Sequence, residues 1–188
     1  MRIRKIDESP GFRYLLLAGI KPRKQERFSD SLQRLHDLKG VSVQVLNADL
    51  LAGEEHVVTA SILAAKAWAG GRRIAKSQAT ELLLYVSGER QIKSAIKLMG
   101  VSENSAGWVV VALSDSIDSL RALGEKLPEF GEEDDGLIDL TDDKIPLLKK
   151  RFRIGNDEIS IAERINVSKT LAVKSLVLER VALSDLYR

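Results

Sequence analysis

Apolar residues fall into short runs that predict the strands of a sheet. Residues 13–20 and 108–113 are rich in Leu, Val and Ala and are bounded by Gly, Pro or Ser, which is typical of buried strands. Residues 41–46 alternate valine with polar side chains, so we expect one face of this segment to be buried. A shorter strand is predicted at residues 137–140. The pattern therefore predicts a small sheet.

The segments between these runs carry apolar residues at helical spacing. A short helix is predicted to begin at Ser29 and to end at Gly40. Its apolar stripe consists of Leu32, Leu35 and Leu38. Further helices are predicted at residues 57–68, 76–86, 92–99, 116–126, 145–151 and 168–185. The helix at 57–68 has small or apolar residues on nearly every face, so it must be buried on more than one side.

These elements predict an α/β (α+β) fold with a small mixed or antiparallel sheet flanked by helices and with a C-terminal interaction helix. We expect one domain over residues 1–188, and the acidic loop near residues 131–136 is the only plausible linker. No apolar run approaches the length of a bilayer span, and the N-terminus lacks the pattern of a secretory leader. We therefore expect a cytoplasmic protein.

Charge is nearly balanced over the chain but is unevenly distributed. Its 188 residues include 29 basic and 27 acidic ones, so the net charge is only +2 and the chain is not a polycation. Basic residues concentrate at 66–97 and 144–153, while residues 125–143 are strongly acidic. Such blocks are most often solvated faces. The basic blocks could also converge into a phosphate-binding patch after folding.

The side chains that usually perform catalysis are scarce. The absence of cysteine excludes thiolate nucleophiles, iron–sulfur clusters and cysteine zinc sites, and His36 and His56 are the only histidines. No Gly-rich phosphate loop or nucleophile elbow occurs. His56 has the chemistry of a general base, but a lone histidine at a helix start is more often a core residue. We expect no catalytic residue, metal or cofactor, and no enzyme.

The C-terminal helix carries apolar residues on more faces than one core can cover. Leu171, Leu178, Ala182 and Leu186 share a stripe, and other apolar residues lie around the remaining faces. One face is therefore expected to pack on the domain while another contacts a second protein. The residues predicted to bind this partner are Val173, Leu176, Val177, Arg180 and Val181.

A competing interpretation concerns residues 159–178. Small, turn-forming and apolar residues there fit the spacing of a helix-turn-helix, which would make the chain a DNA-binding regulator. The second helix offers few side chains that could read bases, because Leu171, Val173, Leu176 and Val177 are apolar.

The centre of the chain resembles the signature of the Cgi/TPRKB family. The resemblance rests on Ile-Ala-Lys-Ser at 74–77, Glu-Leu-Leu-Leu-Tyr at 81–85, Ser-Gly-Glu-Arg-Gln-Ile at 87–92, and Ala95 with Ile96. Asn47, Ala48, Asp49 and His56 stand where the family's motif would place them, and residues 177–183 look like its last helix. The acidic loop and residues 156–166 depart from the pattern.

This resemblance implies a small non-catalytic subunit of the KEOPS (EKC) complex. That complex installs a threonylcarbamoyl group on the adenosine next to the anticodon of tRNAs. The subunit is expected to bind the atypical kinase/ATPase subunit and to help recruit tRNA through its single-stranded 3′ CCA end. The resemblance implies no small-molecule substrate, no cofactor and no membrane partner.

Basic and polar residues of the 66–97 block are the candidates for RNA contact. The candidates are Arg72, Arg73, Lys76, Ser87, Gly88, Arg90 and Gln91. Arginine and lysine charges would contact phosphates, amides of the Ser87–Gly88 turn would approach them closely, and Gln91 would bond base edges. Alternatively, Arg90 pairs with Glu81 and holds neighbouring helices together.

Overall fold

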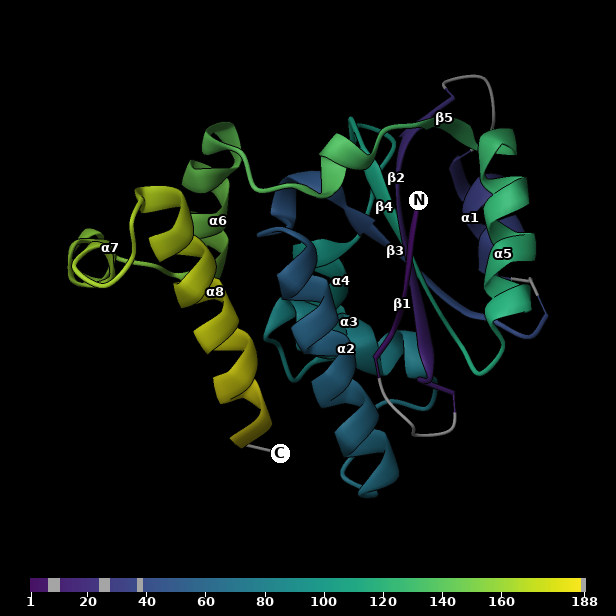
Figure 1. Cartoon of the computed structure of the whole chain (residues 1–188), viewed down its shortest axis with the longest axis horizontal. Helices are drawn as coiled ribbons and strands as arrows, with labels where there is room; N and C mark the ends of the chain where they lie inside the picture. Colours follow the sequence, from purple (N-terminus) through teal and green to yellow (C-terminus); the bar gives the residue numbers. More distant parts are fainter. Residues whose placement is uncertain (7–10, 24–27, 37–38, 187–188) are drawn as a thin grey trace.

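The computed structural model describes residues 1–6, 11–23, 28–36 and 39–186 (Figure 1). The strands that it describes form a five-stranded antiparallel sheet, in the order β1-β2-β4-β3, with β5 also paired to β2. The strands are β1 (Arg2–Lys5), β2 (Tyr14–Pro22), β3 (Ser42–Asn47), β4 (Trp108–Ser114) and β5 (Gly131–Glu133). The predicted α/β class is confirmed, and its sheet is antiparallel rather than mixed. The extent of one domain over residues 1–188 stays a prediction.

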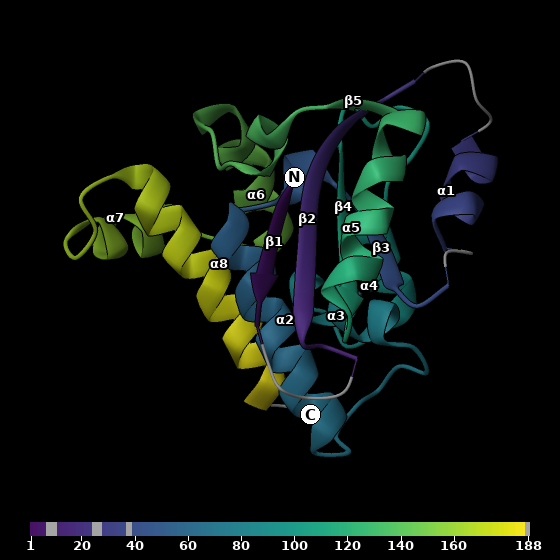
Figure 2. The ribbon, with the colours of Figure 1, turned by 45° about the vertical axis from the view of Figure 1, so that its right-hand side comes forward.

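Alternation along the strands divides the core into two layers of apolar side chains. In β2, Leu15 and Leu17 pack on one face, and Leu16 and Ala18 pack on the other. The central strand β4 is buried at every position, so helices must cover both faces. Figures 1 and 2 show α1 and α5 on one face and α2, α3 and α8 on the other.

Most predicted helices are present within one to three residues of their expected bounds. The helices are α1 (Phe28–His36), α2 (Glu54–Ala69), α3 (Gln78–Ser87), α4 (Ile92–Met99), α5 (Ile117–Lys126), α6 (Ile145–Phe152), α7 (Asn156–Glu163) and α8 (Lys169–Leu186). Leu38, predicted in the stripe of the first helix, lies outside the described residues. Within the described ranges, each helix is too short or too polar to cross a bilayer.

The predictions fail around the acidic segment. Residues 137–140 are not a strand: the short 3-10 turn η3 (Asp135–Ile138) stands there. Residues 131–136 are not a linker either, because β5 pairs with β2 and the Asp134 amide donates to the Gly19 carbonyl at 2.9 Å. A Cβ at Gly19 would lie 2.0 Å from the carbonyl oxygen of Asp134, so only glycine permits this approach. The segment is part of the sheet layer.

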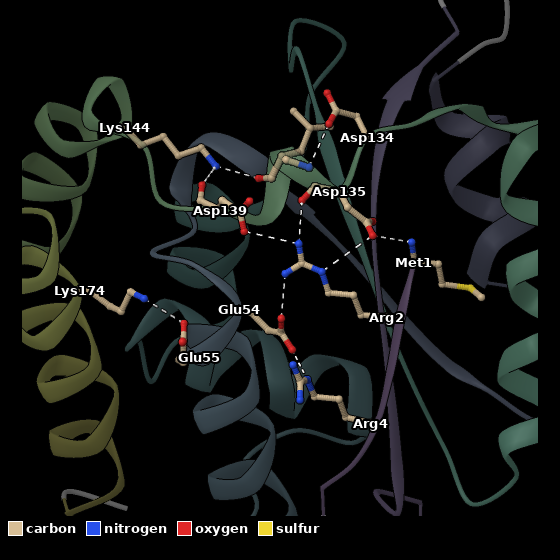
Figure 3. A network of polar contacts seen from close by, with 12 residues as sticks. Met1, Arg2, Arg4, Glu54, Glu55, Asp134, Asp135, Asp139, Lys144 and Lys174 are labelled. Atoms are coloured by element: carbon tan, nitrogen blue, oxygen red, sulfur yellow. Dashed lines mark hydrogen bonds and ion pairs between the residues drawn. The ribbon is translucent and has the colours of Figure 1, made fainter.

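A network of ion pairs fastens this segment and the edge strand β1 to α2 (Figure 3). Arg2 contacts the largely buried Glu54 carboxylate at 2.8 Å, and Arg4 donates a second hydrogen bond to it. The Met1 amine lies 2.6 Å from Asp135. Burial disfavours the charged form of Glu54, but the hydrogen bonds from Arg4 and Arg2 outweigh it and lower the pKa of this carboxyl. The sequence prediction missed β1, because four mostly charged residues show no apolar strand pattern.

Buried Lys144 holds the end of the same segment. It lies in the 3-10 turn η4 (Asp142–Lys144), and its ammonium donates to the carbonyls of Leu137 at 2.8 Å and Asp139 at 2.7 Å. Burial lowers the pKa of Lys144. This member of the 144–153 basic block therefore serves the fold and is not presented to a ligand.

We predict that Glu54→Gln lowers the free energy of unfolding by about 1–2 kcal/mol at pH 7, because two arginines lose their charged acceptor. The folded-state pKa of Glu54 is lowered, so its contribution is present at neutral pH and is lost as the pH falls through that pKa. Urea unfolding at pH 7 and pH 3 measures this. The wild type and the variant should differ at pH 7, and the difference should shrink as the pH falls.

The matched control is Glu125→Gln on α5, where the side chain is exposed. Its effect should stay within about 0.5 kcal/mol at both pH values. An unchanged difference between wild type and Glu54→Gln at pH 3 would contradict the role of the ionised carboxylate.

Candidate functional site

The structure brings two of the predicted RNA-contacting segments to one helix, α8. Arg72 Nη1 lies 3.2 Å from Asp185 Oδ1, and the Tyr85 hydroxyl donates to the same carboxylate oxygen at 2.5 Å. A Cβ at Gly88 would lie 3.7 Å from the carbonyl oxygen of Arg180. Arg180 and Asp185 are five residues apart on α8, roughly 7.5 Å along its axis. The 70–73 segment thus contacts α8 at Asp185, and the 87–91 segment approaches α8 at Arg180, roughly 140° around the helix axis from Asp185.

The segment that precedes α3 is fixed by a buried carboxylate. Glu81 is completely buried and accepts hydrogen bonds from the amides of Ile74 at 3.0 Å and Ala75 at 2.7 Å. Ser77 caps α3 by accepting a hydrogen bond from the Thr80 amide. The alternative that Arg90 pairs with Glu81 is wrong: Arg90 is exposed and makes no ion pair with any described residue.

The Ser87–Gly88 turn does not offer its hydrogen-bond donors to a phosphate. Gly88 has φ +66° and ends α3, which requires a left-handed residue there. The amides of Gly88 and Glu89 donate to the carbonyls of Tyr85 and Leu84 at 3.0 and 3.1 Å. The buried Ser87 hydroxyl donates to the same Leu84 carbonyl. The predicted phosphate contacts of Ser87 and Gly88 are therefore wrong, because these donors already satisfy the helix end.

The other candidates separate into accessible and engaged side chains. Arg90 and Gln91 follow the turn and are exposed. The Arg73 guanidinium stacks over the Trp68 ring at 4.3 Å from its centroid. Lys76 precedes the other end of α3, and a ten-residue helix is roughly 15 Å long. The structure does not gather all seven residues into one site.

The C-terminal helix presents a face other than the predicted one. Val173, Val177 and Val181 are completely buried, and Leu176 is 8% exposed. These four side chains belong to the core cluster and cannot meet a docking partner, so their predicted role in partner binding is wrong. Arg180 is partly accessible and pairs with Glu158.

The accessible stripe of α8 is the one that consists of Leu171, Leu178, Ala182 and Leu186. Leu171 is 40% exposed and Leu186 is 75% exposed, Ala182 is exposed, and Leu178 is half-buried. Val58 and Ile62, half-buried side chains of α2, belong to the helix that packs beside α8. Helical spacing reveals both stripes of α8, but which of them faces the core depends on packing against α2 and α3.

The helix-turn-helix interpretation does not fit the surroundings of α8. Two helices, α7 and α8, do stand at the expected place. At the start of α8, however, Lys174 pairs with Glu55 at 3.1 Å and Thr170 donates to Asp142 at 2.8 Å. Because the first turns of a recognition helix must reach base edges, these contacts oppose DNA reading.

His56 is a structural residue. It is completely buried, accepts a hydrogen bond from the Ala52 amide at 3.2 Å, and donates from Nε2 to the Val86 carbonyl at 2.9 Å. Burial lowers the pKa of His56 to about 4, although the bond to Val86 opposes this shift. The neutral ring thus ties the start of α2 to the end of α3.

Comparisons with known proteins agree with the resemblance seen in the sequence. Residues 26–185 match the family model described as "Kinase binding protein CGI-121". The chain is similar to the "Regulatory protein Cgi121" of Methanocaldococcus jannaschii, with 34% identity over 67% of this chain and 82% of the relative. It is also similar to the "KEOPS complex subunit Cgi121" of Pyrococcus abyssi, with 36% identity over 50% of this chain and 53% of the relative.

We predict that His56 makes stability depend on pH between about 6.5 and 4. Below pH 6.5 the imidazole takes up a proton in the unfolded chain but stays neutral in the folded chain, so the free energy of unfolding falls. The loss is about 3 kcal/mol by pH 4. Urea unfolding at pH 7, 5.5 and 4 measures it.

The comparison variant is His56→Gln, whose side chain also offers one donor and one acceptor group. It should be less stable than wild type at pH 7 and should show a flatter pH profile. Parallel profiles would contradict a lowered pKa of His56 in the folded protein.

Proposed function

Because the chain belongs to the CGI-121 family of kinase-binding proteins, we propose that it is a non-catalytic KEOPS subunit that binds the atypical kinase/ATPase subunit and recruits tRNA. The tRNA is held by its 3′ CCA end while threonylcarbamoyladenosine is formed next to the anticodon by other subunits. The observation that carries the proposal is the family match over residues 26–185. A relative named as a KEOPS complex subunit supports it.

The kinase-binding face is the accessible stripe of α8, defined as Leu171, Leu178, Ala182 and Leu186. Its residues are spaced by seven, four and four positions, so they follow one side of the helix. Aliphatic side chains that remain exposed along a helix are suited to a protein partner.

The tRNA-binding face lies where the 70–73 and 87–91 segments meet α8. Arg90 has a free guanidinium among the described residues, and Gln91 has an exposed amide that makes no capping hydrogen bond to the start of α4. Single-stranded RNA ends are gripped by such charges together with hydrogen bonds to base edges. Arg72 adds a charge nearby, although Asp185 partly neutralises it.

We predict that Leu171→Glu and Ala182→Glu each weaken binding to the purified kinase/ATPase subunit at least tenfold, because each places a charge in an apolar interface. Isothermal titration calorimetry measures the affinity. The matched control is Ile165→Glu, an equally apolar and 86% exposed position in the turn between α7 and α8. Unchanged affinity of both stripe variants, with native circular dichroism, would remove this face from the interface.

We predict that Arg90→Glu weakens tRNA binding at least tenfold at low salt without changing thermal stability, because an exposed cation becomes an anion. Electrophoretic mobility shifts with intact tRNA and with tRNA lacking CCA measure the effect. Lys126→Glu, an exposed charge reversal on α5 across the sheet, is the control. Equal affinity of wild type for intact and trimmed tRNA would refute recognition of the 3′ end.

A further inference from the structure

A pocket of about 260 Å³ opens between the 87–89 turn, the end of α6 and α8. Three of its lining residues are arginines: Arg151 and Arg153 come from the end of α6, and Arg180 comes from α8. Phe152, which is almost completely buried, also lines it. The pocket therefore joins the basic 144–153 block to the 87–89 turn, which contributes no basic side chain.

The arginines from α6 are available to a ligand. Arg151 and Arg153 are exposed and form no ion pair or hydrogen bond through their side chains with any described residue. Arg180 is held by Glu158, which fixes its direction and reduces its charge. Glu89 is the one acidic residue among those that line the pocket. Two guanidinium groups at the pocket are therefore unpaired, although the Glu89 carboxylate reduces the net positive charge of the lining.

Arg153 ends α6 in an unusual backbone conformation. Arg153 has φ +54° and ψ +46°, the left-handed conformation that ends α6, and its amide donates to the Lys149 carbonyl. Gly or Asn adopts this conformation with less strain, and an arginine there costs about 1 kcal/mol or more. This conformation ends the helix and leaves the Arg153 side chain at the pocket.

We propose that this pocket binds a phosphate group of single-stranded RNA through Arg151 and Arg153. Guanidinium groups match phosphate oxygens in geometry and charge. The proposal rests on the proposed function and extends its RNA-binding face: Gly88 lines the pocket, and Arg90 and Gln91 follow two and three residues later. The exposed residues thus lie within three residues of the pocket lining along the chain. The donors are side chains, because the turn amides already cap α3.

The test is the double variant Arg151→Gln with Arg153→Asn. Asparagine tolerates the left-handed conformation at position 153, so the fold is expected to persist. The affinity of the double variant for tRNA at low salt should fall about tenfold. The slope of log affinity against log salt should shrink by about one. Arg121→Gln, an exposed arginine on α5, is the matched control and should leave both quantities unchanged.

A second measurement separates this inference from the proposed function. Amide resonances of Gly88 and Arg153 are followed while a short single-stranded oligoribonucleotide ending in CCA, or inorganic phosphate, is added. Shifts with the RNA that disappear in the double variant support the pocket. If the double variant binds tRNA as tightly as the wild type does, the pocket is overturned as an RNA site, and the proposed function still stands. Shifts with inorganic phosphate alone overturn its assignment to RNA, and failure of the wild type to bind tRNA overturns the RNA-binding function itself.

Discussion

Complete burial of the central strand β4 is the constraint on which the rest of the structure depends. A strand buried on both faces requires helices on both sides of the sheet, and α2, α3 and α8 supply one of these layers. The valine face of α8 is buried by this packing. Its opposite stripe is left to solvent, and its C-terminal third contacts Arg72 and approaches Gly88. The surfaces proposed for partner and RNA are thus consequences of how the sheet is covered.

The residues of the family signature divide into two physical roles. Glu81 and His56 bond to backbone groups inside the protein, where an unpaired donor or acceptor would be costly, and the exposed Ser77 caps α3. They hold the ends of helices and the loop before α3 in fixed positions. Arg90 and Gln91 of the same signature face solvent. Buried polar anchors of this kind position exposed side chains without an energetic cost to the ligand for ordering the loop.

Much of the fold could be predicted from the sequence, because β4, α4 and α5 have apolar patterns and caps that local rules describe. Residues 137–140 resemble a strand locally, yet the ion pairs and hydrogen bonds of the acidic segment impose a turn. In the candidate site, the contacts of Arg72 and Gly88 with α8 depend on long-range packing. The same is true of the buried face of α8, since both of its stripes are apolar. The 87–88 turn was recognised, but the inward direction of its amides follows from helix capping, which the phosphate interpretation overlooked.

The Asp185 carboxylate stands between the two proposed surfaces. It accepts hydrogen bonds from Arg72 and Tyr85, while Ala182 and Leu186 lie within one turn of it on α8. Any coupling between two ligands that bind one helical turn apart must be reciprocal in free energy. If the kinase subunit alters the affinity for tRNA by some factor, tRNA must alter the affinity for the kinase subunit by that same factor. Binding of the kinase subunit and binding of tRNA would then be linked by one coupling free energy.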